Sequence, residues 1–351
     1  SSTCSLSDKL IHLMPNRTHV ALDTMGRPLR DLRVSVTDRC NFRCRYCMPR
    51  ERFGKEHNFL PKSEILSYEE IQKFVLACKP LGLRKVRITG GEPLLRKDLP
   101  KLVRYISDLE LEVALTTNGS FLKREAARLA EAGLDRVTIS LDAVDQELHS
   151  RITDSNVTVA DILDGIHEAI SRGLGPVKVN CVVQRGVNES QIPKLVRQFR
   201  GTGAIVRFIE FMDVGGTNGW TRGQVVPTSD ILEFLSDEFD LVPLMRDSPS
   251  DVASRWGHSD GSGEVGFISS VSQPFCGDCV RARLSSNGKL FTCLFTSIGH
   301  DMSELIRGEG DVSNLNEAIK EVWTRRSDRY SEDRSSDTYS LPRVEMSYIG
   351  G

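Results

Sequence analysis

Six strand-like segments alternate with segments of helical pattern, and this alternation limits the possible folds more than any other feature of the sequence. The expected strands cover residues 32–37, 85–89, 112–117, 136–141, 177–183 and 205–212. Repeated βα units form a parallel sheet with helices on its outer face. Because a closed TIM barrel needs eight such units, six units predict an α/β fold, a partial (βα)6 TIM-like barrel that stays open on one side.

Helices are expected at residues 67–78, 99–109, 123–132, 159–172 and 191–200, and Ser67 and Glu70 have the spacing of a capping box. Beyond residue 212 the pattern changes to a helix at 229–237, antiparallel strands at 265–271 and 281–295, and helical segments within 298–325. We therefore expect three parts: an N-terminal arm (1–27), the partial barrel (28–214) and a C-terminal antiparallel β plus helix extension (215–351).

The expected strands carry polar residues on one face. Since side chains alternate along a strand, the polar residues of each strand point the same way, while the apolar residues meet the helices. A polar inner face suits a hydrated ligand site better than a filled barrel core. The residues expected on this face are Arg87, Thr89, Thr138, Ser140, Asp142, Lys178, Asn180, Glu210 and Met212.

Nine cysteines are the informative part of an otherwise ordinary composition. The 351 residues include 46 Lys and Arg against 48 Asp and Glu, and the net charge of -2 gives no general attraction to nucleic acid or membrane. Six cysteines form two triplets, Cys40/Cys44/Cys47 and Cys276/Cys279/Cys293. Such short spacings favour metal or redox use in a cytoplasmic protein over disulfides. Cys78 and Cys181 are expected to be buried in the core, and Cys4 stands apart.

Iron–sulfur chemistry can explain both triplets. Three thiolates can hold three irons of a cubane cluster and leave the fourth iron open, whereas most electron-transfer clusters have four cysteines. The C-x3-C-x2-C spacing of the first triplet is unusual for zinc. The second triplet could instead form a Cys3His zinc site with His300, so a zinc-stabilised binding protein is an alternative on this pattern alone.

The segment Gly90-Gly91-Glu92-Pro93 follows the second expected strand, at the rim where sites form in parallel barrels. Its exposed backbone and one carboxylate could bind the ammonium and carboxylate groups of an amino acid. A Gly-Gly pair alone usually marks a turn, and its position beside the first cysteine loop is what favours a binding role. The sequence has no Walker-type loop, so ordinary phosphoryl hydrolysis is not indicated.

These motifs together resemble the radical S-adenosylmethionine superfamily. The resemblance rests on the Cys40/Cys44/Cys47 spacing, with Tyr46 before the last cysteine, and on Gly-Gly-Glu-Pro. Further segments are similar to the branch of that superfamily that acts on GTP in molybdenum cofactor biosynthesis. They are TDRCN at 37–41, RITGGEPLLR at 87–96, TTNG at 116–119, SLDA at 140–143, FIEFM at 208–212, the second cysteine triplet and the Gly350-Gly351 end.

The resemblance implies a role for each matching residue. Two [4Fe-4S] clusters would be held by Cys40, Cys44 and Cys47 and by Cys276, Cys279 and Cys293. S-adenosyl-L-methionine would contact Tyr46 through its backbone, and also Gly91, Ser140 and Met212. GTP would contact Arg33, Arg87, Thr116, Lys178, Arg281, Ala282 and Arg283, and the tail Gly350-Gly351 would reach into the site.

The implied activity is a lyase reaction that joins the ribose C3' of GTP to its guanine C8 and gives (8S)-3',8-cyclo-7,8-dihydroguanosine 5'-triphosphate. The implied partners are GTP, cyclic pyranopterin monophosphate synthase as the next enzyme, a reductant such as flavodoxin or ferredoxin, and a second copy of the chain in a homodimer. The alternative within the superfamily is a different radical enzyme with an auxiliary iron–sulfur cluster.

Overall fold

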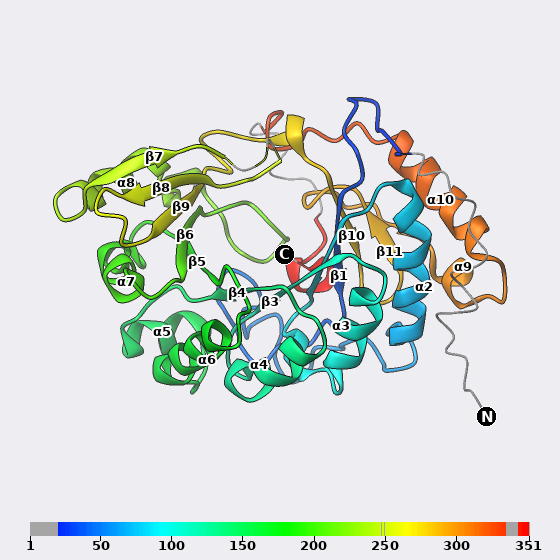
Figure 1. Cartoon of the computed structure of the whole chain (residues 1–351), viewed down its shortest axis with the longest axis horizontal. Coiled ribbons are helices and arrows are strands. Elements are labelled where there is room, and N and C mark those ends of the chain that lie inside the picture. Colours follow the sequence, from blue (N-terminus) through cyan, green and yellow to red (C-terminus); the bar gives the residue numbers. More distant parts are fainter. Residues whose placement is uncertain (1–19, 247, 249, 335–342, 351) are drawn as a thin grey trace.

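The computed structural model describes residues 20–246, 248, 250–334 and 343–350. The six expected strands are present as β1 (Asp31–Ser35), β2 (Lys85–Thr89), β3 (Glu112–Thr117), β4 (Arg136–Ser140), β5 (Lys178–Val183) and β6 (Ile205–Glu210). They pair in parallel in chain order, and the sheet does not close on itself (Figure 1). The prediction of a partial barrel is therefore confirmed.

The C-terminal strands join the parallel sheet instead of forming a separate antiparallel unit. Strand β9 (Glu264–Ile268) pairs in parallel with β6, and β10 (Arg281–Leu284) pairs in parallel with β1. The antiparallel strand pairs lie at the two flanks, where β7 (Leu241–Leu244) and β8 (Ser254–His258) follow β9, and β11 (Lys289–Phe291) and β12 (His300–Asp301) follow β10. The expected antiparallel pairing is present at these flanks, but the sequence did not indicate that β9 and β10 also pair in parallel with the barrel strands.

Helices cover the outer face of the sheet, as the βα pattern predicts (Figure 1). The helices that follow strands β1 to β6 are α2 (Tyr68–Cys78), α3 (Leu99–Ser107), α4 (Leu122–Glu131), α5 (Gln146–Thr153), α6 (Val159–Ser171), α7 (Ile192–Phe199) and α8 (Thr228–Ser236). The capping box is confirmed, because Ser67 Oγ accepts a hydrogen bond from Glu70 N at 3.1 Å and Glu70 Oε2 accepts one from Ser67 N at 2.6 Å. Helix α5 was not expected.

The apolar face of the strands packs against these helices and forms the core. Val34, Val86 and Val179 have no exposed surface, and Cys78 and Cys181 are equally buried, as expected. Toward the C-terminus, α9 (Ser303–Arg307) and α10 (Val312–Thr324) extend this layer, and the short α11 (Met346–Ile349) contacts β1. No helix in the described part of the chain is both long and apolar enough to cross a membrane.

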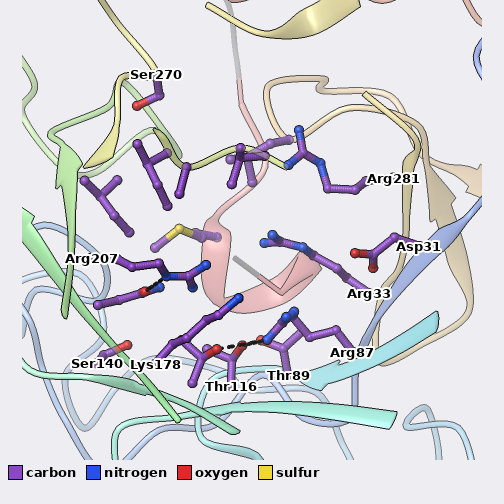
Figure 2. A pocket seen from close by; sticks show the side chains of 18 of the residues that line it. Asp31, Arg33, Arg87, Thr89, Thr116, Ser140, Lys178, Arg207, Ser270 and Arg281 are labelled. Carbon is purple, nitrogen blue, oxygen red and sulfur yellow. Dashed lines mark hydrogen bonds between the residues drawn. The ribbon is translucent and has the colours of Figure 1, made fainter. Parts of the chain in front are cut away.

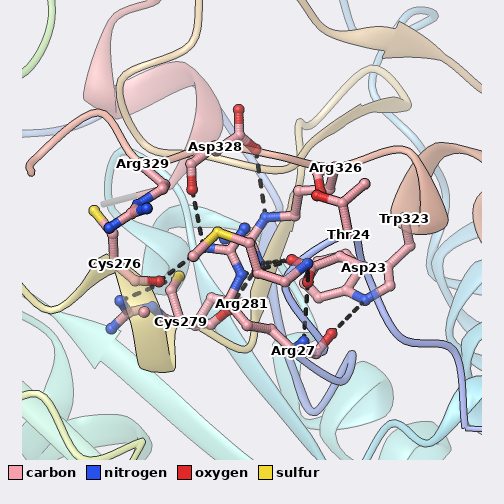
Figure 3. Close-up of polar contacts among 12 residues, drawn as sticks. Asp23, Thr24, Arg27, Cys276, Cys279, Arg281, Trp323, Arg326, Asp328 and Arg329 are labelled. Atoms are coloured by element: carbon pink, nitrogen blue, oxygen red, sulfur yellow. Dashed lines mark hydrogen bonds and ion pairs between the residues drawn. The ribbon is translucent and has the colours of Figure 1, made fainter. Parts of the chain in front are cut away.

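A buried ion-pair network ties the start of the described chain to its C-terminal part (Figure 3). Asp23 Oδ2 lies 2.6 Å from Arg27 Nε and 3.2 Å from Arg326 Nη1, and all three side chains are almost fully buried. The same guanidinium groups donate to the loop that carries the second cysteine triplet: Arg27 Nη1 to the Cys276 carbonyl and Arg326 Nη1 to the Cys279 carbonyl, both at 2.7 Å. The network therefore fixes the backbone of that loop.

We expect Asp23→Ala to lower the free energy of unfolding by about 3–5 kcal/mol, because removing one partner leaves uncompensated buried charges. Urea unfolding followed by circular dichroism measures the loss. Asp164→Ala is the matched control, since it breaks only the exposed pair with Lys123, and it should leave stability nearly unchanged. Similar small losses for both variants would contradict a structural role for the network.

Candidate active site

A cavity of about 870 Å³ lies on the inner face of the open sheet (Figure 2). The residues that line it come from both cysteine loops and from the inward-facing positions of the parallel strands. Most of the site residues expected from the sequence are among them: Arg33, Cys40, Cys44, Tyr46, Cys47, Arg87, Gly91, Thr116, Ser140, Lys178, Met212, Cys276, Cys279, Arg281, Arg283 and Cys293. The topology thus brings together residues that are up to 260 positions apart, from Arg33 to Cys293.

The first cysteine loop follows β1 and is held from two sides. The backbone N–H of Arg43 donates to the Thr153 carbonyl at 2.8 Å, and that of Arg45 donates to the Ile152 carbonyl at 3.2 Å. The Arg43 guanidinium also donates to the Cys40 carbonyl at 2.7 Å. These contacts attach the loop to the end of α5, so the three half-buried thiols are held at the rim of the cavity.

The glycine loop after β2 lies directly against the cysteine loop. Gly91 N donates to the Thr37 carbonyl at 2.8 Å, and a Cβ on Gly91 would lie 2.3 Å from the Arg39 carbonyl oxygen. Gly90 has a φ of 150°, and a Cβ there would lie 2.5 Å from the Thr37 carbonyl oxygen. Both glycines are therefore required for close backbone approach, and their backbone remains on the cavity wall.

The carboxylate of this loop does not face the cavity, so the expectation that it offers a binding carboxylate there was wrong. Glu92 is fully buried and accepts hydrogen bonds from Asn118 N and Thr117 Oγ1, both at 2.7 Å. Burial raises its pKa to about 7 despite these bonds. Glu92 joins the ends of β2 and β3 and so supports the loop from behind.

The donor set of each triplet, three free thiols at the cavity, matches the three cysteine ligands of a cubane with one open iron. The described residues include no group of three His, Cys, Asp or Glu side chains that could surround one ion. A zinc ion needs its ligands about 2.0–2.3 Å from one centre, whereas each thiolate of a cubane binds a different iron. His300 is exposed and is not among the residues lining the cavity, which argues against the Cys3His zinc alternative.

The second cysteine loop faces the same cavity as the first. Cys276 lies in a turn before β10, Cys279 just before that strand and Cys293 just after β11. Burial would raise the pKa of Cys279, but Arg281 and Arg326 outweigh it and lower the pKa to about 6. Arg281 Nη2 lies 3.4 Å from the Cys279 sulfur. The electropositive surroundings therefore favour the thiolate form of Cys279, whereas burial raises the pKa of Cys293 to about 11.

Cationic side chains cover the strand wall between the two loops. Arg33 stands in register with Arg283 on one neighbouring strand and with Arg87 on the other, which gives a row of three guanidinium groups. Burial, followed by repulsion from Arg283 and Arg281, lowers the pKa of Arg33. The Nε atoms of Arg33 and Arg283 are buried and have no hydrogen-bond partner within the described residues. Unpaired buried donors of this kind point to an anionic ligand.

Lys178 and Arg207 extend this wall across β5 and β6 (Figure 2). Burial and the nearby Arg207 lower the pKa of Lys178 to about 8. Arg207 Nε donates to Asn180 Oδ1 at 2.9 Å, and Arg87 Nη1 donates to the hydroxyls of Thr116 and Thr138 at 3.2 Å. The expected residue Thr116 therefore both lines the cavity and orients Arg87.

Arg207 was not expected at the site, because the inner face of this strand was assigned one residue out of register. On β6, Ile205, Arg207 and Ile209 face the cavity. Glu210, expected on the inner face, points away and accepts hydrogen bonds from the backbone N–H groups of Val271 and Ser272, both at 2.8 Å. Met212 does line the cavity, because it follows the end of the strand, where alternation no longer applies.

Tyr46 and Ser140 line the cavity near the first cysteine loop. The Tyr46 hydroxyl donates to Asp142 Oδ2 at 2.6 Å, and the other oxygen of Asp142 accepts from Val182 N at 2.8 Å. The side chain of Tyr46 thus connects the cysteine loop to β4 and β5, whereas the sequence indicated only a backbone role.

Three expected site residues stand apart from this group. The side chain of Ala282 is buried in the core on the other face of β10, so its backbone is the part near the ligand wall. Gly350 lies against Thr89, since a Cβ there would be 2.3 Å from Thr89 Cγ2, and Thr89 lines the cavity. Gly351 lies outside the described residues.

Comparison with solved structures identifies the same fold in other proteins. Streptococcus suis SuiB bound to S-adenosylmethionine superposes with a TM-score of 0.62 at 15% identity, over 89% of this chain and 69% of that chain. A second structure, native anSMEcpe with bound AdoMet, gives a TM-score of 0.53 at 17% identity, over 81% of each chain. At these identities the likeness concerns the fold alone.

Family models and curated relatives cover almost the whole chain. The Radical SAM superfamily model matches residues 34–199, and the Molybdenum Cofactor Synthesis C model matches residues 204–332. The GTP 3',8-cyclases of Acidothermus cellulolyticus and Xanthomonas axonopodis pv. citri are each 48% identical to it, and that of Staphylococcus carnosus is 45% identical. Each alignment covers 94% of this chain and 98% of the relative. The chain therefore belongs to the GTP 3',8-cyclase family of radical S-adenosylmethionine enzymes.

Proposed function

We propose that this enzyme converts GTP to (8S)-3',8-cyclo-7,8-dihydroguanosine 5'-triphosphate, the first step of molybdenum cofactor biosynthesis. The observation that carries the proposal is that one cavity contains two separate cysteine triplets and a wall of cations, several of which form no ion pair within the described residues. A single-cluster radical enzyme needs only the first triplet, and a zinc-stabilised binding protein needs no such cation wall.

The first triplet and the loops beside it would hold the radical-generating cofactors. Cys40, Cys44 and Cys47 would bind a [4Fe-4S] cluster, and the main-chain groups at Gly91 would meet the amino-acid end of S-adenosylmethionine. When bound, the cluster and S-adenosylmethionine supply a carbon-centred radical that can remove an unactivated hydrogen atom. Ser140 and Met212 would line the remainder of that site, and the Tyr46–Asp142 hydrogen bond keeps the cysteine loop in place.

The cation wall would bind and orient the triphosphate of GTP. A row of three planar guanidinium groups, from Arg33, Arg87 and Arg283, can donate hydrogen bonds to phosphate oxygens. Lys178, Arg207 and Arg281 add further positive charge around the same space. Holding the nucleotide by its charged end fixes the ribose relative to the first cysteine loop, and orientation of this kind is the main contribution a protein makes to cofactor chemistry.

The second triplet would place the guanine ring. Cys276, Cys279 and Cys293 would hold a second [4Fe-4S] cluster, whose open iron would take a purine atom as its fourth ligand. Because Arg281 follows Cys279 by two residues and faces the same cavity, purine and phosphate recognition are joined on one strand. We further propose Gly350 and Gly351 as part of this site, since Gly350 reaches Thr89 on its wall.

The remaining assignments concern the surroundings of the enzyme. We propose cyclic pyranopterin monophosphate synthase as the consumer of the product, a flavodoxin or ferredoxin as the reductant, and a homodimer as the working form. All eight described cysteines are free thiols, which suits a reducing compartment such as the cytoplasm.

Anaerobic turnover is the direct test of the activity. The reconstituted protein, supplied with GTP, S-adenosylmethionine and dithionite, should form 5'-deoxyadenosine and the cyclised nucleotide, both measured by liquid chromatography and mass spectrometry. Cys40→Ala should abolish both products, because it removes a ligand of the first cluster. Undiminished 5'-deoxyadenosine formation by Cys40→Ala would contradict the assignment.

Cys276→Ala should separate the roles of the two triplets. We expect about eight irons per chain in the unmodified protein and about four in the variant, if each triplet holds one cubane. The variant should keep more of its S-adenosylmethionine cleavage than of its GTP cyclisation. Iron analysis and both product assays measure this, and Cys78→Ala is the control, since Cys78 is buried in the core away from the cavity. Equal loss of both products would argue against a substrate-holding second cluster.

GTP affinity should fall as the pH rises through about 8. Arginine keeps its proton in proteins, whereas Lys178 is charged below its pKa of about 8 and neutral above it. The charged form attracts the triphosphate, so binding is tightest on the acid side. Lys178→Arg should remove this pH dependence, and Lys178→Gln should weaken binding about 10- to 100-fold at pH 7. Calorimetric titration with GTP measures the affinities, and an unchanged pH profile in Lys178→Arg would assign the titration to another group.

A further inference from the structure

A second cavity, of about 480 Å³, adjoins the first cysteine loop. Its walls come from that loop, from the end of α5 and from the loops after β5 and β6. Tyr46 lines both cavities, whereas its neighbours Cys44 and Cys47 line the main one. The cysteine loop is therefore the partition between the second cavity and the site assigned to the first cluster.

Two arginines at this second cavity are exposed and unpaired. Arg45 belongs to the cysteine loop and Arg151 to the last turn of α5. The hydrogen bond from Arg45 N to the Ile152 carbonyl, at 3.2 Å, holds the two segments together. Neither side chain has an ion pair or hydrogen bond with any other described residue. The exposed Val187 adds an apolar contact on the same rim.

The surroundings of these arginines are also positive. Arg43 lies in the same loop with its guanidinium bound to backbone carbonyls, and Arg50 is paired with Asp154. The hydrogen bond from Arg50 lowers the pKa of Asp154, and the charges of Arg45 and Arg43 lower it further. Two further carboxylates lie nearby: Glu51 raises the pKa of Arg50, and Glu189 accepts a hydrogen bond from Gly186 N at 2.7 Å. Four arginines, Arg43, Arg45, Arg50 and Arg151, stand against these three carboxylates, so this face keeps a small excess of positive charge.

The reaction proposed above requires two electrons from outside. One cleaves the sulfonium C–S bond and yields a thioether and a carbon radical, and the second, with a proton, reduces the nucleotide radical left after ring closure to the 7,8-dihydro product. Neither GTP nor S-adenosylmethionine supplies them. A donor that is oxidised by one electron must therefore come close to the first cluster. Because the cysteine loop separates the second cavity from the main one, a donor on that side would reach the loop without entering the main cavity.

We propose that the face around Arg45 and Arg151 is the docking site for an acidic one-electron carrier protein, an inference that rests on the proposed function. Exposed charges around a small apolar contact are typical of a transient protein interface. They raise the association rate with a partner of opposite charge and make that rate depend on salt. The carrier would contact the outer side of the cysteine loop, next to Arg45.

The test compares two reductants on the same reconstituted holoenzyme. Formation of 5'-deoxyadenosine is measured with reduced flavodoxin, a small acidic flavoprotein, and separately with dithionite, which is small enough to need no docking site. In the double variant Arg45→Gln/Arg151→Gln, the flavodoxin-driven rate at low salt should fall about tenfold. The dithionite-driven rate should stay within about twofold of the unmodified protein.

Arg124→Gln is the matched control, because Arg124 is an exposed arginine on α4, on the helical outer surface. It should leave both rates unchanged. Equal rates with flavodoxin in the double variant and the unmodified protein would overturn the docking site. A parallel loss with both reductants would also overturn it, since the substitutions would then act on the cluster itself. Failure of the unmodified protein to cyclise GTP with dithionite would instead refute the proposed function.

Discussion

The crowding of like charges on one face of the sheet is the constraint on which the rest of this structure depends. Arg33, Lys178 and Arg283 face one cavity and form no ion pair within the described residues. Such side chains repel one another and resist collapse, so the inner face of the sheet cannot be filled like that of a closed barrel. The free energy for holding them comes from the outer face, where apolar strand residues pack against the helices. The open sheet follows from the six βα units, and the charge pattern keeps its inner face free as a cavity.

The two cysteine loops reach this cavity by different physical routes. The first loop follows the end of β1 and is held by close backbone contact with Gly90 and Gly91. The second depends on long-range contacts, because β10 must pair with β1 and the Asp23–Arg27–Arg326 network must fix the carbonyls of Cys276 and Cys279. The C-terminal part of the chain is therefore built into the wall of the site. The C-terminal helix α11 belongs to the same wall, since it lies beside β1 within the open sheet (Figure 1).

Local patterns predicted the parts of the fold that depend on neighbours in sequence. Alternation placed Arg87, Thr138, Ser140 and Lys178 on the inner face, and the capping box fixed the start of α2. The misplacement of Glu210 and the omission of Arg207 have one cause: the inner face was assigned together with Met212, which lies beyond the end of β6 and does not follow its alternation.

Interactions between distant segments could not be read from the sequence. The parallel pairing of β10 with β1 joins residues 250 positions apart, Asp31 and Arg281. Likewise, nothing local to Glu92 shows that its carboxylate turns toward Thr117 and Asn118 instead of the cavity. The cysteine spacing identified the chemistry, but only the fold shows that both triplets and the cations share one space.

The central claim is that the ribose of GTP is held beside the first cysteine loop, so that hydrogen is removed from its C3' position. Turnover of GTP carrying deuterium at ribose C3', followed by mass spectrometry of the 5'-deoxyadenosine formed, tests this claim most directly. The account predicts that the deuterium is transferred to 5'-deoxyadenosine. Formation of unlabelled 5'-deoxyadenosine together with cyclised product would contradict it.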